Sequence, residues 1–382
     1  MQQLNGPAGD ENLAIIKQSC MAIDSMIEGL DKEDASKYVG ELVPRLSPLF
    51  QHPEVKVQIS AIGATGSIAS ASEEAFMPFF EGTMQTLGQF VSIKDSDDEL
   101  ELRGVVCDSL GKIASAVGAE AFQPYVTPLM QASEEALHLD HPRLRETSYI
   151  LWSTMSKVYD DKFAPYLAGV VKGLIECLQQ DESEDGVTLG EEARELLGQE
   201  VTIAGKKVKI ADIGAGADDD TTIDIDDDDD EDDWDDLGAV TAVAMEKEIA
   251  VEVIGDVLTH TRGHFLPYFQ QCVEAVLALV DHHFEGVRRS AIGTLWRGYA
   301  SLWAMAEDNG MAKWQSGLPL KVQATDDLMK LGSLIMTATL ALWQDEVDRY
   351  VSNYFPFFPS TSSYYDDHSS LHPAHFDAQM CT

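Results

Sequence analysis

The sequence contains few basic residues for its length. Its 382 residues include 26 Lys and Arg against 66 Asp and Glu, which gives a formal net charge of −40. A surface of this sign repels the phosphates of nucleic acid and attracts Lys- and Arg-rich proteins, with an attraction that salt weakens. The charge therefore argues against a nucleic-acid-binding protein and favours basic protein partners.

Paired cysteines and long apolar runs are also missing. The five cysteines are scattered and form no CxxC pair, which is typical of reduced thiols in a cytosolic or nuclear protein. The first residues, MQQLNGPAGDENLA, have neither the basic nor the apolar region of a signal peptide. The longest mostly apolar run, near residues 334–343, is too short to cross a bilayer. We expect no membrane insertion.

The motifs of catalysis and of metal or cofactor binding are absent as well. Gly214-Ala-Gly216 lacks both phosphate-loop patterns. An EF-hand register starting at Asp224 places Asp229 where glycine is needed, so we allow only weak, nonspecific binding of divalent cations there. His260 and His264 are four residues apart without the tighter ligand set of a zinc site. We predict no metal, no cofactor, no catalytic residue and no enzymatic activity.

The most unusual stretch is the acidic run from Asp218 to Asp236, which carries fourteen carboxylates, no Lys or Arg, and one aromatic residue. Such a segment buries too little apolar surface to offset the entropy of ordering, so we predict a disordered, solvated loop. Its candidate binding residues are Asp218, Asp219, Asp220, Asp224, Asp226, Asp227, Asp228, Asp229, Asp230, Glu231, Asp232, Asp233, Trp234, Asp235 and Asp236.

The chain on both sides of this run repeats a two-helix pattern. Helices of one set open with an apolar and a basic residue, and helices of the other set open with Phe-x-Pro, where proline suits the first helical turn. Pro78 and Pro124 are 46 residues apart, and Pro124 and Pro165 are 41 apart, a period typical of HEAT repeats. We expect the basic residues of the first set to pair with acids of the next repeat; they are Lys56, Arg103, Arg145 and Arg288.

These patterns predict an all-α HEAT-repeat solenoid, an open right-handed superhelix, with one acidic disordered insertion. We expect about four helix pairs in residues 1–181 and about two in residues 239–349. The insertion, residues 182–238, should contain a short helix from Gly190 to Leu197 and a small hairpin over Val201–Ile210 beside the acidic loop. Residues 350–382 lose the helical period and should form a disordered tail outside the repeats.

Two runs give the chain a family resemblance. The sequences AVTAVAMEKEIAVEVIGDVLTHTRGHFLPYF and EGVRRSAIGTLWRGYASLWAMAEDNG, with LLGQEVTIAGKKVKI before the acidic run, resemble the middle of an importin-β (karyopherin-β) nuclear import receptor, of the fungal branch that carries ribosomal proteins and histones. The resemblance covers roughly residues 10–349. It implies a central portion of a longer receptor that shuttles between cytoplasm and nucleus.

The family's partners follow from the resemblance alone. It implies basic cargo such as histones or ribosomal proteins, release of that cargo by Ran-GTP, and contact with nucleoporin Phe-Gly repeats. The N-terminal Ran site of the family is expected to be missing here. Helical spacing combined with the family's cargo face gives seven candidate cargo-facing residues: Glu176, Gln179, Gln270, Glu274, Asp281, Trp343 and Glu346. For each of these residues, an ordinary solvent-exposed position without a role in cargo binding is an equally good interpretation.

Two rival functions stay open at this point. A HEAT scaffold would assemble other proteins without any response to Ran. An acidic histone chaperone would need only the acidic run, so the isolated loop peptide would bind histones as well as the whole chain does. The acidic insertion and the match around residues 237–308 favour the transport receptor over the scaffold, and the chaperone stays open.

Overall fold

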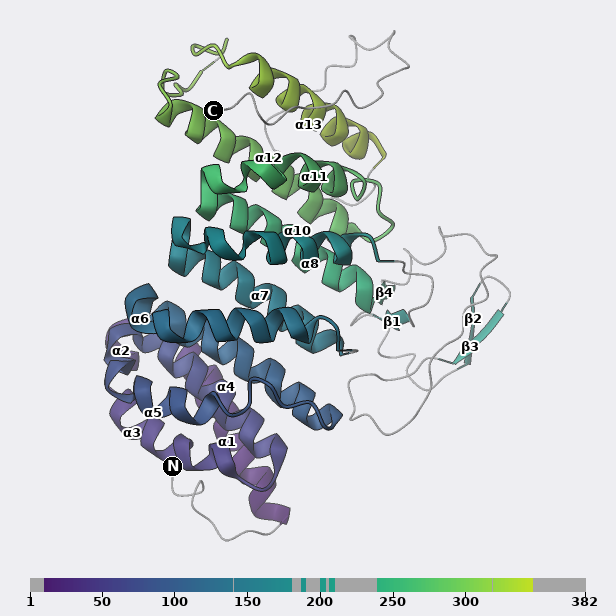
Figure 1. The fold of residues 1–382 in the computed structure, drawn as a ribbon. Helices are drawn as coiled ribbons and strands as arrows, with labels where there is room; N and C mark the ends of the chain where they lie inside the picture. The colour runs from purple at the N-terminus through teal and green to yellow at the C-terminus, as the bar shows by residue number, and fades with distance from the viewer. Residues whose placement is uncertain are drawn as a thin grey trace. The chain divides into compact units, whose positions relative to one another are not determined.

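The structure, a computed structural model, describes residues 10–139, 141–180, 187–189, 200–203, 206–209, 239–317 and 319–345. The chain divides into two compact units, Met1–Gly173 and Leu174–Thr382. Both consist mainly of helices (Figure 1). The acidic run, the predicted helix over 190–197 and the predicted tail all lie outside the described residues.

The first unit contains helices that follow one another in pairs. The helices and 3₁₀ turns of this unit are α1 (Asp10–Glu28), α2 (Lys32–Ser36), α3 (Val39–Leu46), η2 (Ser47–Gln51), α4 (Val55–Ser72), η3 (Glu73–Phe76), α5 (Met77–Leu87), α6 (Asp97–Ala136), α7 (Pro142–Tyr159) and η4 (Asp160–Tyr166). Helix α8 (Leu167–Leu178) contains the boundary between the two units. The sequence prediction of an all-α repeat fold is confirmed.

Local capping explains where these helices begin. The Asp31 carboxylate accepts a hydrogen bond from the backbone N–H of Asp34 at 2.9 Å and starts α2. At α6 the Ser96 hydroxyl accepts from the N–H of Glu99, and the Glu99 carboxylate accepts from the N–H of Asp95 at 2.8 Å. This reciprocal arrangement resembles a capping box and satisfies donors that have no partner within the helix.

The two helices of a pair are joined by a turn with unusual backbone geometry. Glu73, Asp160 and Arg262 have φ values of 47°, 46° and 47°, and each follows the last residue of a long helix. In α6 the equivalent turn falls at Gly118, with φ 80° and ψ 168°, so two helices are joined across a kink. The second helix predicted at Phe122 is therefore present, but it begins just after Gly118, a few residues earlier than the Phe-x-Pro pattern indicated.

Small residues let the first helices of neighbouring pairs approach closely. A Cβ added to Gly66 of α4 would lie 2.9 Å from the Ser109 hydroxyl of α6. That hydroxyl donates to the carbonyl of Ile62 at 3.2 Å. Apolar side chains fill the space beside these contacts, and the buried Trp152 indole donates to the Ser133 hydroxyl at 2.8 Å. The phenylalanines of the Phe-x-Pro openings are fully buried; they are Phe76, Phe122, Phe163 and Phe265.

The second unit repeats this plan. It contains α10 (Ala242–Thr261), η6 (Arg262–Phe265), α11 (Leu266–Leu277), α12 (Glu285–Asp308) and α13 (Asp326–Asp345). Helices α10 and α12 lie side by side, and α12 also contacts α13 (Figure 1). Helix α11 ends at Leu277, where the backbone N–H groups of Ala278 and Leu279 close the last turn, so Asp281 lies beyond the helix.

Two short antiparallel strand pairs lie between α8 and α10. Strand β2 (Glu200–Ile203) pairs with β3 (Lys206–Lys209) at the position of the predicted hairpin. Strand β1 (Val187–Leu189) pairs with β4 (Ala239–Thr241), which the sequence did not predict. Since β4 directly precedes α10, this second ladder brings the chain before residue 190 next to the chain after residue 238.

Candidate functional site

Three acids of α10 pair with side chains of the adjacent helix α12. Arg289 of α12 lies 2.9 Å from the Glu248 carboxylate, and Arg297 lies 2.8 Å from that of Asp256. The Ser290 hydroxyl donates to Glu252 at 3.0 Å. Glu248, Glu252 and Asp256 are four residues apart and so share one face of α10. This row of carboxylates therefore holds two helices together.

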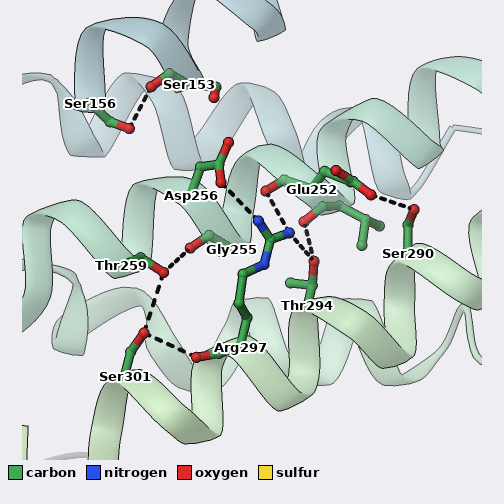
Figure 2. Close-up of polar contacts among 11 residues, drawn as sticks. Ser153, Ser156, Glu252, Gly255, Asp256, Thr259, Ser290, Thr294, Arg297 and Ser301 are labelled. Atoms are coloured by element: carbon green, nitrogen blue, oxygen red, sulfur yellow. Dashed lines mark hydrogen bonds and ion pairs between the residues drawn. The ribbon is translucent and has the colours of Figure 1, made fainter. Parts of the chain in front are cut away.

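Arg297 is the centre of this polar contact (Figure 2). Besides Asp256, its guanidinium donates to the Glu252 carbonyl at 3.3 Å and to the Thr294 hydroxyl at 3.1 Å. The Thr294 hydroxyl in turn donates to the Val251 carbonyl. Gly255 leaves the space for the guanidinium, since an added Cβ would lie 2.8 Å from three of its atoms.

Sequence reasoning missed this network. The sequence does show acidic residues at intervals of four in one helical segment and two arginines eight residues apart in another. Nothing in the sequence alone showed that the two helices are neighbours. The pairing with acids predicted for the helix-opening basic residues is wrong for Arg103, which is fully buried and donates to the Ala132 carbonyl at 2.7 Å.

The second helix, α11, carries a single acidic residue in a different setting. Glu274 is exposed, and its carboxylate accepts a hydrogen bond from the Gln270 side-chain amide at 3.0 Å. Among the residues that the structure describes, no basic side chain pairs with Glu274. Phe269, Cys272 and Val276 are buried on the other side of the helix. The Glu274 carboxylate is thus exposed, with a neutral amide as its hydrogen-bond partner.

The other candidate cargo-facing residues are distributed over the second unit. Glu176 lies on α8 and Gln179 one residue beyond its end, and both are exposed. Asp281 is exposed but follows the end of α11, so helical spacing does not place it on the face of Glu274. Trp343 is half-buried on α13. Glu346 and all of the acidic-run residues lie outside the described part of the chain.

A small groove lies on the first helices of unit one. It has a volume of about 220 Å³ and is lined by side chains of α4, α6 and α7, among them Ser70, Lys112, Ile150 and Thr154. The Ile150 side chain is 41% exposed. The Lys112 ammonium lies 3.3 Å from Asp108 and 3.9 Å from Glu28, so these carboxylates balance its charge.

The clearest pKa shifts among the described residues come from the burial of cysteine thiols. Burial raises the pKa of the Cys20 thiol to about 11 and that of the Cys107 and Cys272 thiols to about 12, so all three stay protonated at neutral pH. In the described residues no three His, Cys, Asp or Glu side chains gather into a metal site. None of the described helices is long and apolar enough to span a bilayer.

The family model and two similar proteins carry importin names. The family model described as importin subunit beta-1-like, TPR repeats, matches residues 8–150. The chain is 34% identical over 350 residues to the Schizosaccharomyces pombe protein named probable importin subunit beta-4, which covers 90% of this chain and 30% of that protein. It is 27% identical over 124 residues to mouse importin-4, covering 32% of this chain and 11% of that protein.

Solved structures agree in fold. The crystal structure of Kap121p is similar with a TM-score of 0.61 at 19% identity, covering 88% of this chain and 28% of Kap121p. Kap121p bound to Nup53p gives a TM-score of 0.61 at 20% identity, with the same coverage of both chains. The chain thus spans less than a third of the length of these relatives.

Proposed function

Because this chain belongs to the importin-β family, we propose that it forms part of a nuclear transport receptor and binds a basic segment of a cargo protein. The observation that carries the proposal is the contrast between two sets of acids. Glu248 and Asp256 are paired with arginines of the adjacent helix α12, whereas the exposed Glu274 is bonded to a neutral amide. A Lys- or Arg-rich peptide would supply the missing positive charge.

The acidic run adds a second, longer-range attraction. It supplies fourteen of the 66 acidic residues, and charge of this density attracts a basic partner before close contact forms. The run and Glu274 therefore take different parts in one process. The run increases the rate of encounter, and Glu274 contributes to the contacts that hold the bound segment.

The cargo class and its control belong to the same proposal. Histones and ribosomal proteins are the basic cargo expected from the fungal branch that the sequence resembles, with Ran-GTP as the releasing factor and shuttling between cytoplasm and nucleus. Kap121p, which shares the fold, has been crystallised bound to Nup53p, to Ste12p and to Pho4p. Those complexes support binding of protein segments as the mode of action.

The groove beside Ile150 offers a place for the phenylalanine of a nucleoporin Phe-Gly repeat. Its volume of about 220 Å³ is small for a typical ligand pocket and is of the order of one large side chain. Ile150 and Leu151 supply apolar surface. Replacing Ile150 by Asp should abolish binding of a Phe-Gly peptide and leave histone-tail binding intact, which separates the two partners.

The decisive experiment is a pull-down of the full chain with histone-tail and ribosomal-protein baits, with and without Ran-GTP. A transport receptor segment binds the basic baits, and a longer receptor that contains this segment together with the Ran site releases them when Ran-GTP is added. A scaffold binds its partners regardless of Ran-GTP. If the isolated peptide 218–236 captures the histone tail as strongly as the whole chain, the protein is an acidic histone chaperone and the proposal is wrong.

A further inference from the structure

Histidine recurs at the junctions between consecutive helix pairs. In three of these junctions the ring nitrogen Nδ1 accepts a hydrogen bond from a backbone N–H two or three residues further on. The bonds are His52 with the N–H of Glu54 at 3.1 Å, His141 with that of Leu144 at 3.3 Å, and His282 with that of Phe284 at 3.1 Å. An Nδ1 can accept a hydrogen bond from an amide only while it carries no proton, so protonation of the ring at this atom would remove the bond.

At the junction between α6 and α7, the histidine also caps the following helix. His141 is the N-cap residue of α7, in an extended conformation with φ −152° and ψ 104°, and its ring is half-buried. Its carbonyl also accepts from the N–H groups of Leu144 and Arg145. The helix therefore begins on this one residue, with Pro142 in its first turn.

The charges around His141 oppose one another. Burial is the main cause that lowers the pKa of His141 below its ordinary value of 6.5. Arg145 and Arg143 of α7 act in the same direction, and Asp97 and Glu101 of α6 act against it. The N-terminus of α7 carries the positive end of the helix dipole, which further disfavours a second positive charge there.

We propose that the α6–α7 junction is a proton-sensitive joint, in which a proton taken up from solvent at Nδ1 of His141 converts the acceptor into a donor and removes one of the hydrogen bonds that hold the first turn of α7. The protonated ring would face the Leu144 N–H donor to donor. Leu144 is buried, and Thr147 one turn later packs against Gly104 of α6. Loosening this turn therefore loosens the contact between two successive helix pairs.

The direction of the pH effect follows from the lowered pKa of His141. The fold favours the neutral ring, so the cap contributes fully above pH 6.5, the ordinary value for histidine. Its contribution is lost as the pH falls through the lowered pKa. The neighbouring α5–α6 junction provides a built-in reference, because α6 is capped by the Ser96 hydroxyl, which has no charge to gain in this range.

Residue-resolved amide hydrogen exchange on the full chain tests the joint between pH 8 and pH 4.5, with intrinsic rates divided out. We expect the protection of the Leu144 amide to fall about five- to tenfold, the equivalent of losing one N-cap, while that of the Glu99 amide stays constant. His141→Asn keeps a capping oxygen without a titrating ring and should remove the pH response. Its protection at pH 8 should match that of the wild type.

A second measurement needs no variant. The ring of His141, followed by NMR in the wild-type chain, should titrate at the same pH at which the Leu144 amide loses protection. The joint is ruled out if the protection of Leu144 does not change as His141 titrates. It is equally ruled out if His141→Asn shows the same loss of protection as the wild type, because another group would then be responsible.

Discussion

At the residue scale, the main exception to ordinary burial rules is Arg103. Its side chain is fully buried, and its Nη2 donates to the Ala132 carbonyl. Among the described residues, Nε and Nη1 have no hydrogen-bond partner. A buried guanidinium without a paired carboxylate costs more in lost hydration than one carbonyl returns.

This imbalance predicts the outcome of replacing Arg103. Arg103→Met keeps most of the side-chain volume and removes the charge, so the free energy of unfolding should be unchanged or about 2 kcal/mol higher. Arg103→Ala leaves a cavity and should lower it by about 2–4 kcal/mol. Urea unfolding of both variants compares them. A loss above about 2 kcal/mol for Arg103→Met would show that the charge has a stabilising partner.

At the scale of elements, the turn inside each helix pair carries strain. A φ near +47° is unfavourable for any residue with a Cβ, and glycine avoids that cost. Arg262 occupies such a turn, and its ion pair with Asp308, at 3.8 Å between exposed side chains, contributes little. In α6 the chain uses a glycine, Gly118, at the corresponding turn, one residue further from the buried phenylalanine.

Two substitutions at position 262 separate the backbone from the side chain. Arg262→Gly and Arg262→Ala both remove the ion pair, but only glycine relieves the turn. The free energy of unfolding of the glycine variant should exceed that of the alanine variant by about 1 kcal/mol. Equal urea midpoints for the two variants would mean that the turn carries no strain.

The contact between α10 and α12 can be tested with two glycines. Gly255→Ala would place a methyl group against the Arg297 guanidinium and displace it from Asp256. Losing these charged hydrogen bonds outweighs the better helix propensity of alanine, so the net cost should be about 1 kcal/mol. Gly293 of α12 is exposed with nothing within 4 Å of an added Cβ. Gly293→Ala should therefore stabilise by up to about 1 kcal/mol.

The helical periodicity and the Phe-x-Pro openings predicted the repeat class well. Helix α4 begins at Val55, and α11 begins one residue after Phe265, close to the expected positions. The turn at Gly118 and the end of α11 at Leu277 were not predictable. Each depends on the backbone geometry of one or two residues, which hardly changes the helical spacing of apolar residues. The β1–β4 ladder was missed for another reason. Its strands are three residues each and some fifty residues apart in sequence, so no local pattern joins them.

The candidate site was predictable only in outline. Exposure of Glu176 and Glu274 agrees with the helical spacing, and the Gln270–Glu274 hydrogen bond follows from a separation of four residues. The sequence did not show which acids form ion pairs with a neighbouring helix. Glu248 and Glu274 look alike there, and only the arginine on the adjacent helix distinguishes them.

At the scale of the whole molecule, charge is the dominant property. The net charge is −40, and removing the fourteen acids of the acidic run would leave the chain at −26. A partner would thus still meet an acidic surface without the run. The run and the helical surface act over different distances, so they should affect different rate constants.

The last prediction separates these two contributions. Replacing residues 218–236 by a Gly/Ser segment of equal length should slow association with a histone-tail peptide about tenfold at low salt and flatten its salt dependence. The dissociation rate should change little, because steering ends once contact is made. Glu274→Gln retains a hydrogen-bonding group but removes the charge, so it should speed dissociation about three- to fivefold, with association nearly unchanged. Stopped-flow mixing at several salt concentrations measures both rates, with circular dichroism as the control for fold. Equal low-salt association rates with and without the run would show that it is a spacer, and that the helical surface alone attracts basic partners.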